Sequence, residues 1–384
     1  MRELLAPAGD LTRLKVALLY GADAVYIGGK LFSLRSTANN FSINDLKKGL
    51  AFAHKHHKKV YLTINSYVHE RDMNKLDKYL NKIKDIGIDA LIVSNLGVLT
   101  LANKYGFTIH LSTQMSIINS EAINFLSKYN VKRVVLGREV SLKEINIIKE
   151  KTNVELEVFI HGGMCSAYSG RCTLSNNMSN RDANRGGCAH CCRWEYHLYS
   201  KNGELISKDN ISIGSKDLNT FEIINNIKAD SLKVEGRMKS INYIATVIRN
   251  YRLLLDGKSN VKDCLFDLKY AESRETTQGF LGGEVRKKDL IYNLNDNMVN
   301  QNFIGMIESK HQDMYKITSK NNFSLEEPLL VIGYDGSEQV LTDYELFDET
   351  FMTMNINIHP GSVIYLKTSM KLKKYFLVRK LKKL

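Results

Sequence analysis

The chain has 384 residues, of which 43% are hydrophobic and 25% charged, values that are ordinary for a folded globular protein and exclude a collagen-like, disordered or coiled-coil chain. No stretch approaches the roughly 18 apolar residues of a membrane-spanning helix, and the N-terminus lacks the apolar core of a signal peptide, so we expect a cytoplasmic protein without a membrane partner. The excess of 54 Lys and Arg over 41 Asp and Glu gives a net charge of +13, which favours an anionic partner such as nucleic acid.

Residues 1–258 repeat one pattern, in which a short apolar run is followed by an amphipathic stretch. The runs are continuous rather than alternating, which is typical of parallel strands buried on both faces. The eight candidate strands are Glu3–Ala6, Ala24–Ile27, Lys59–Ile64, Ala90–Val93, Thr108–Leu111, Arg133–Leu136, Glu155–Ile160 and Ser231–Val234. With seven intervening helices and one after the last strand, they predict a (β/α)8 TIM-like barrel. An open doubly wound sheet is the alternative, but the first turn has no GxGxxG sequence.

The regular pattern is interrupted after the seventh strand, where residues 161–230 form an insertion that holds five of the six cysteines. The insertion also contains a hairpin signal at Asn202-Gly203. Because it leaves the C-terminal end of a barrel strand, where the active sites of this fold lie, we expect it to be functional. Residues 259–302 are polar and are predicted to connect the barrel to a small β-barrel or sandwich over residues 303–384.

The C-terminal end of the chain is basic, with eight cations and no acid between Lys367 and Leu384. We expect this end to contact RNA phosphates without reading base sequence, so that RNA binding would weaken steeply with salt. A solubilising tail is the alternative.

The five clustered cysteines are spaced Cys165-x6-Cys172-x15-Cys188-x2-Cys191-Cys192. In a cytoplasmic chain, clustered cysteines are more often metal ligands or redox groups than disulfides. The first gap is too long for a zinc knuckle, whereas iron–sulfur clusters accept four thiolates at varied spacing. Spacing alone therefore favours an iron–sulfur cluster and leaves zinc or thiol chemistry open.

Several polar and charged side chains directly follow predicted strands and would gather at the mouth of the barrel. They are Arg35, Asn65, Gln114, Arg138, His161, Glu235 and Arg237. Arg138, Glu235 and Arg237 are candidate catalytic residues, since arginine binds carboxylates or phosphates through paired hydrogen bonds, although plain ion pairs at the rim are the alternative. His161 could move a proton or could be structural. Arg35, Asn65 and Gln114 are candidates for binding the substrate.

A resemblance to a known family covers most of the barrel. The sequence ELEVFIHGGMCSAYSGRCTLS, residues 155–175, resembles the signature of the collagenase-like peptidase family U-32, as do NRDANRGGC at 180–188 and CRWEY at 192–196. The further matching segments are Leu34-Arg35, Asn39–Phe41, Ser112–Ser116, Asn119–Glu121, Arg133–Glu139 and Ser231–Ser240. The C-terminal module, with Asn322–Ser324, resembles that of the tRNA hydroxylation branch of the family.

This resemblance implies 5-hydroxylation of the wobble uridine of tRNA, with a 4Fe–4S cluster on four cysteines and prephenate, a small dicarboxylate, as a required metabolite. Relatives hydroxylate ribosomal RNA or support oxygen-independent ubiquinone hydroxylation. The implied ligands are Cys165, Cys172, Cys188 and Cys192, with Cys191 as the substitute for the last. Many relatives carry another cysteine where this chain has Asn219, so that position offers no ligand here.

Two other functions stay open on the sequence. A peptidase would agree with the family name, but the chain has neither an HExxH zinc motif nor a GxSxG nucleophile elbow. A non-catalytic RNA-binding protein with a structural metal site is the third hypothesis.

Overall fold

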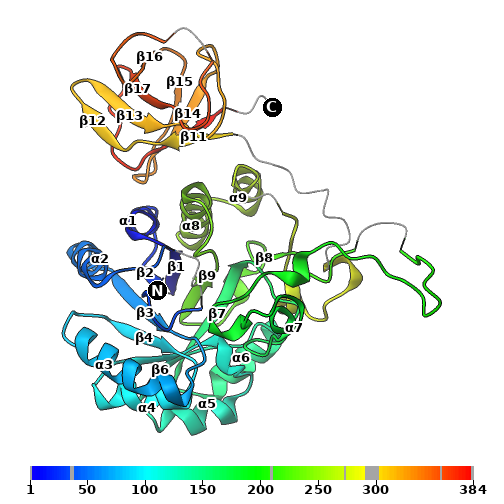
Figure 1. Ribbon diagram of the computed structural model, residues 1–384. Coiled ribbons are helices and arrows are strands. Elements are labelled where there is room, and N and C mark those ends of the chain that lie inside the picture. The colour runs from blue at the N-terminus through cyan, green and yellow to red at the C-terminus, as the bar shows by residue number, and fades with distance from the viewer. Residues whose placement is uncertain are drawn as a thin grey trace.

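The computed structural model describes residues 2–34, 39–207, 211–271, 274–289, 302–354 and 357–381. A large unit of alternating strands and helices is followed by a smaller all-β unit (Figure 1). The prediction of a (β/α)8 TIM-like barrel with a small C-terminal β domain is confirmed. The doubly wound alternative is wrong, because the parallel sheet closes on itself. None of the helices in the described ranges is long and apolar enough to cross a membrane.

Eight parallel strands form the barrel in chain order, and the last of them pairs with both the seventh and the first. The strands are β1 (Glu3–Ala8), β2 (Ala24–Gly28), β3 (Lys59–Ile64), β4 (Ala90–Val93), β5 (Ile109–Leu111), β6 (Val131–Val135), β7 (Glu155–Gly162) and β9 (Ser231–Val234). Each of them coincides with a predicted strand to within two residues. The agreement follows from burial on both faces, which gives these strands apolar runs that the sequence displays directly.

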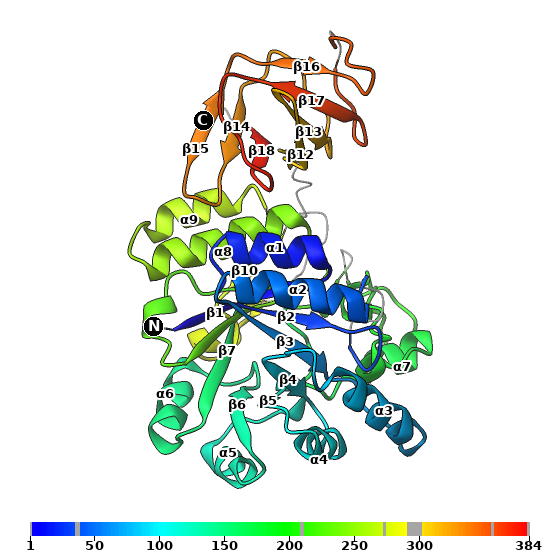
Figure 2. The same cartoon turned by 90° about the vertical axis from the view of Figure 1, so that its left-hand side faces the viewer.

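Helices surround the barrel (Figure 2). They are α1 (Leu11–Leu19), α2 (Ile43–Lys55), α3 (Met73–Ile83), α4 (Leu96–Lys104), α5 (Ser120–Ser127), α6 (Leu142–Lys151), α8 (Ile241–Leu255) and α9 (Val261–Leu268). The prediction of a regular helix between the last two barrel strands is wrong for the residues that the structure describes. The one α-helix there is α7 (Leu174–Ser179), which has six residues and belongs to the cysteine-bearing segment.

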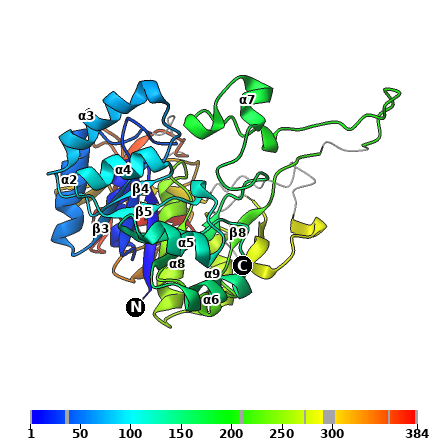
Figure 3. The ribbon, with the colours of Figure 1, turned by 90° about the horizontal axis from the view of Figure 1, so that it is seen from below.

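The insertion between β7 and β9 contains a strand that the sequence pattern does not predict. Strand β8 (Asp217–Asn219) runs antiparallel to the end of β7, and β10 (Thr276–Thr277) pairs with its other edge. Before β8, the chain projects away from the barrel (Figure 3). The predicted turn lies in this projection, where Gly203 adopts a φ of 85° and its N–H donates to the Ser200 carbonyl at 3.0 Å.

The barrel interior contains a buried charge network beside an apolar layer. Glu157 is fully buried and accepts hydrogen bonds from Lys233 Nζ at 2.6 Å and from Arg133 Nη1 at 3.3 Å. Arg133 also pairs with Glu3 and with Glu155, toward the N-terminal ends of the strands. A buried network of this kind holds its members rigidly only while every charge keeps its partner.

His110 lies in the same interior, with its ring centroid 4.6 Å from that of Tyr61, and burial lowers its pKa to about 3. The imidazole is therefore neutral in the folded chain, whereas the unfolded chain takes up a proton near pH 6.5. Stability from this group is fully present above pH 6.5 and is lost as the pH falls toward 3. Between pH 7 and pH 5, the free energy of unfolding of the wild type should fall by about 2 kcal/mol more than that of His110→Gln. Urea unfolding at the two pH values measures this difference. A stability difference that is equal at both pH values would contradict a neutral buried His110.

The C-terminal domain consists of two four-stranded antiparallel sheets. The first has the order β11-β18-β14-β15 and the second β12-β13-β17-β16. Their strands are β11 (Phe303–Met306), β12 (Ser309–His311), β13 (Met314–Thr318), β14 (Leu329–Ile332), β15 (Glu338–Leu341), β16 (Glu345–Phe347), β17 (Val363–Lys367) and β18 (Leu377–Lys380). The apolar faces of the two sheets share one core, as in a sandwich.

The β domain packs on the helices α1 and α8, on the outside of the barrel. The Tyr20 hydroxyl donates to the Ile332 and Tyr375 carbonyls at 2.8 and 3.0 Å. Arg379 is 1% exposed and pairs with Asp267 at 2.7 Å. The expectation that the whole basic end contacts RNA is therefore wrong for Arg379, which is part of the domain interface.

Candidate functional site

The cysteine-bearing segment lies over the C-terminal ends of β5 and β6. The Ser169 N–H donates to Glu139 Oε1 at 2.9 Å, and the Tyr67 hydroxyl donates to the Gly170 carbonyl at 2.9 Å. At Gly170 a Cβ atom would come within 2.1 Å of the Gln114 carbonyl oxygen, and φ is 73°. Only glycine allows this close approach, which places the segment at the mouth of the barrel.

Three of the cysteines, Cys165, Cys188 and Cys192, interact electrostatically at this mouth. Burial raises the pKa of the Cys192 thiol, and electrostatic repulsion from the nearby Cys165 and Cys188 raises it further. The Arg193 guanidinium and a hydrogen bond with Ser166 act in the opposite direction. Three of the four implied ligands therefore lie close enough to influence one another electrostatically.

The adjacent Cys191 points elsewhere. It is 1% exposed, and its Sγ lies 3.7 Å from Ser175 Oγ and 3.9 Å from Ser179 Oγ, both on α7. Cys191 thus packs under α7 while Cys192 shares its surroundings with Cys165 and Cys188. The geometry favours Cys192 over Cys191 as the partner of the other thiols.

The thiols are gathered but do not converge on one point. Within the described ranges, no group of three or more His, Cys, Asp or Glu side chains is arranged to hold a metal ion. Cys172 is fixed through its backbone, since its carbonyl accepts a hydrogen bond from Asn184 Nδ2 at 2.9 Å. The donor set, soft thiols on a single segment, has the chemistry of an iron–sulfur or zinc site.

Two arginines lie beside the thiols. Arg138 Nη1 lies 3.8 Å from Cys165 Sγ, and its guanidinium stacks on the Phe159 ring at 4.0 Å. The Nε atom of Arg138 is buried and has no hydrogen-bond partner among the residues described. Arg193, next to Cys192, brings a second cation.

A cluster around Asp217 lies beside the thiols and was not found from the sequence. Asp217 is 1% exposed and pairs with Arg193 at 3.0 Å, Lys239 at 3.3 Å and Arg274 at 3.7 Å. Burial alone would raise the pKa of Asp217, but the three cations hold it below its usual value. Only tertiary pairing reveals this site, because Asp217 lies on the unpredicted strand β8.

Arg237, which follows β9, reaches the ends of β2 and β3. It is 4% exposed and donates to Ser33 Oγ at 2.7 Å and to Thr63 Oγ1 at 3.3 Å, at the ends of β2 and β3. Asn65 accepts a hydrogen bond from the Leu34 N–H at 3.2 Å and so holds the same loop. Arg35, predicted to bind substrate with Asn65, falls outside the described residues. Gln114 lies under Gly170, as described above.

The structure separates His161 from the mouth. His161 is fully buried, and its Nδ1 lies 3.1 Å from the Tyr251 hydroxyl on α8. The side chain faces the helix layer, as the structural alternative expects, and its role in moving a proton stays a prediction. Glu235 remains at the mouth, where a Cβ on Gly163 would lie 3.6 Å from its Oε2 and 3.7 Å from Arg193 Nη2.

Fold and site together define a barrel protein with a thiol-bearing segment over its strand ends and an added β domain. A model of peptidase family U32 matches residues 9–290, and a model of the U32 C-terminal domain matches residues 299–379. The chain belongs to peptidase family U32.

Three relatives extend the comparison. The tRNA hydroxylation protein P1 of Bacillus subtilis is 36% identical over 398 residues, covering 98% of this chain and 94% of the relative. An uncharacterized protease of Methanocaldococcus jannaschii is 41% identical over 268 residues, covering 67% and 66%. The 23S rRNA 5-hydroxycytidine synthase of Escherichia coli is 37% identical over 259 residues, covering 66% of this chain and 39% of that protein.

Proposed function

We propose that this protein is an RNA-hydroxylating enzyme that acts on tRNA, with the wobble uridine as the modified base. Similarity to a tRNA hydroxylation protein over nearly the whole of both chains supports this proposal. The rRNA-hydroxylating relative points to the same chemistry on RNA, through the barrel region. The observation in the structure that carries the proposal is the meeting of Cys165, Cys188 and Cys192 with two arginines at the mouth of the barrel.

We further propose that these thiols, with Cys172, hold a 4Fe–4S cluster. Such a cluster would supply one-electron redox chemistry at the mouth. Arg138 and Arg193 would offset the charge of four thiolates, and Arg193 is itself held in place by Asp217. A dicarboxylate such as prephenate would find cationic partners in Arg138, which follows β6, and Arg237, which follows β9.

Nucleoside analysis of tRNA tests the proposed function directly. In a strain from which the gene is deleted, tRNA is expected to lack 5-hydroxyuridine derivatives, and the wild-type chain is expected to restore them. The Cys165→Ala chain should fail to restore them, because it loses a thiol at the mouth. Cys264→Ala is the matched control, since Cys264 is buried at α9 in the barrel core. Unchanged tRNA nucleosides in the deletion strain would overturn the proposal.

A further inference from the structure

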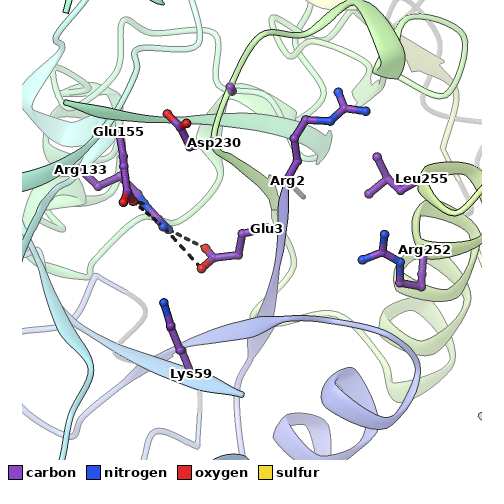
Figure 4. A pocket seen from close by; sticks show the side chains of 9 residues that line it. Arg2, Glu3, Lys59, Arg133, Glu155, Asp230, Arg252 and Leu255 are labelled. Atoms are coloured by element: carbon purple, nitrogen blue, oxygen red, sulfur yellow. Dashed lines mark hydrogen bonds and ion pairs between the residues drawn. The ribbon is translucent and has the colours of Figure 1, made fainter. Parts of the chain in front are cut away.

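A pocket of about 680 Å³ lies at the end of the barrel opposite the cysteines. Figure 4 shows the side chains that line it. Glu3, Lys59 and Glu155 mark its position, because they are the first residues of β1, β3 and β7. The full lining is Arg2, Glu3, Lys59, Arg133, Glu155, Ala229, Asp230, Arg252 and Leu255. Its volume lies in the range of small-molecule sites, which is about 300 to 1,000 Å³.

The acidic side chains of this pocket are all neutralised by cations of the protein itself. Glu3 accepts from Arg133 Nη1 at 2.5 Å, and Glu155 pairs with Arg133 Nη2 at 2.8 Å and with Lys132 Nζ at 3.1 Å. Asp230 pairs with Lys149 at 2.6 Å and also accepts the Leu156 N–H at 2.8 Å. These carboxylates therefore have little capacity left to bind a cation from solution.

Two of the cationic side chains have no such compensation. Among the residues described, no carboxylate pairs with Lys59 or with Arg2. Arg2 Nη1 instead donates to the Ile224 and Ile227 carbonyls at 2.7 and 3.2 Å. Burial lowers the pKa of the Arg2 guanidinium, which shows that its charge is partly removed from water. The pocket thus carries positive charge that the protein does not neutralise.

Arg252 adds a hydrogen-bond donor that is left unused. Its Nη atoms pair with Asp23 at 3.2 Å and Asp256 at 2.6 Å, but its Nε is buried without a hydrogen-bond partner in the described part of the chain. A buried donor without a partner costs free energy unless a ligand or water fills the site. Figure 4 shows Lys59 and Arg252 extending from different elements toward the middle of the pocket.

We propose that this pocket binds a small oxyanion, a phosphate or carboxylate group, through Lys59, Arg2 and the Nε of Arg252. Lysine and arginine on separate elements provide charge from several directions, as phosphate and carboxylate sites require. The site lies at the end of the barrel away from the cysteines, so it is independent of the proposed hydroxylation. The oxyanion could belong to a free metabolite or to an RNA backbone phosphate.

Isothermal titration calorimetry with pyrophosphate and with citrate tests the site. The wild-type chain is expected to bind at least one of these anions, and Lys59→Gln and Arg2→Gln are each expected to weaken the binding about tenfold or more. Loss of one charged contact that contributes about 1.4 kcal/mol weakens the affinity tenfold. Lys82→Gln is the matched control, because it removes one charge from an exposed position on α3.

Circular dichroism checks that each variant is folded before its affinity is compared. The proposed site would be overturned if the wild type bound neither anion. It would also be overturned if Lys82→Gln lost as much anion affinity as Lys59→Gln and Arg2→Gln. Titration with tRNA then identifies the source of the oxyanion. A parallel loss of tRNA affinity in Lys59→Gln and Arg2→Gln supports a backbone phosphate, whereas unchanged tRNA affinity with lost pyrophosphate or citrate binding supports a free metabolite.

Discussion

Anaerobically purified Cys192→Ala protein is expected to contain no iron, whereas Cys191→Ala protein keeps iron and sulfide in roughly equal amounts. The two cysteines are adjacent in sequence but have different surroundings. Cys192 is influenced by the thiolates of Cys165 and Cys188, while Cys191 packs against Ser175 and Ser179 of α7. If the proposed cluster is present, removal of Cys192 should therefore abolish it, together with the tRNA hydroxylation that we propose to depend on it.

Cys191→Ala serves as the matched control, since it removes a thiol one residue away. This change should leave the iron content unaltered and lower only the free energy of unfolding, by about 1 kcal/mol, because it truncates a small buried side chain. Iron analysis and visible absorbance of both variants provide the comparison. Retention of iron by Cys192→Ala and its loss from Cys191→Ala would reverse the ligand assignment. Stoichiometric zinc without iron in the wild type would remove the cluster from the proposed function altogether.

Glu157→Gln is expected to destabilise the barrel by about 3 to 5 kcal/mol. The change leaves Lys233 buried at 4% exposure without the carboxylate that lies 2.6 Å from its Nζ. Arg133 loses one partner but keeps Glu3 and Glu155. The large cost thus comes from one uncompensated ammonium group in the barrel interior. Urea unfolding at pH 7 measures it.

Two further variants separate this explanation from a general loss of packing. The double variant Glu157→Gln with Lys233→Met removes both members of the pair and should recover most of the lost stability. Glu155→Gln also removes a partner of Arg133, but Glu155 is partly exposed, so the expected cost is about 1 kcal/mol or less. A double variant no more stable than Glu157→Gln alone would contradict the uncompensated-charge explanation.

The sequence predicts the barrel well because its signal is local. Each strand of the closed sheet is buried on both faces, and its apolar run is visible without knowledge of its neighbours. Two features escape this reasoning: the described residues between β7 and β9 contain only the short α7 instead of a regular barrel helix, and strand β8 is added there. Three residues such as Asp217–Asn219 carry no periodicity, and their pairing with Gly162 depends on where the insertion folds back.

Side-chain roles divide in the same way. Sequence position at a strand end places Arg138, Arg237 and Glu235 at the mouth, since strand direction alone decides which end they occupy. The same argument does not place the side chain of His161. The register between β7 and β9 is irregular next to this residue, and its side chain points toward Tyr251 on α8. The sequence shows at which end of a strand a residue lies. It does not show to which side the residue points where the strand register is irregular.

The sequence by itself determined the eight-strand barrel, the β domain and the cysteine-rich segment at the active end, because periodicity and spacing are properties of the chain alone. Only the tertiary structure decided which of Cys191 and Cys192 lies with the other thiols and that Arg379 belongs to the domain interface. It also revealed the cations that surround Asp217 and the uncompensated charge of Lys59 and Arg2. These features depend on contacts between residues far apart in sequence, and the free energy of a charge is set by the partners that folding brings to it.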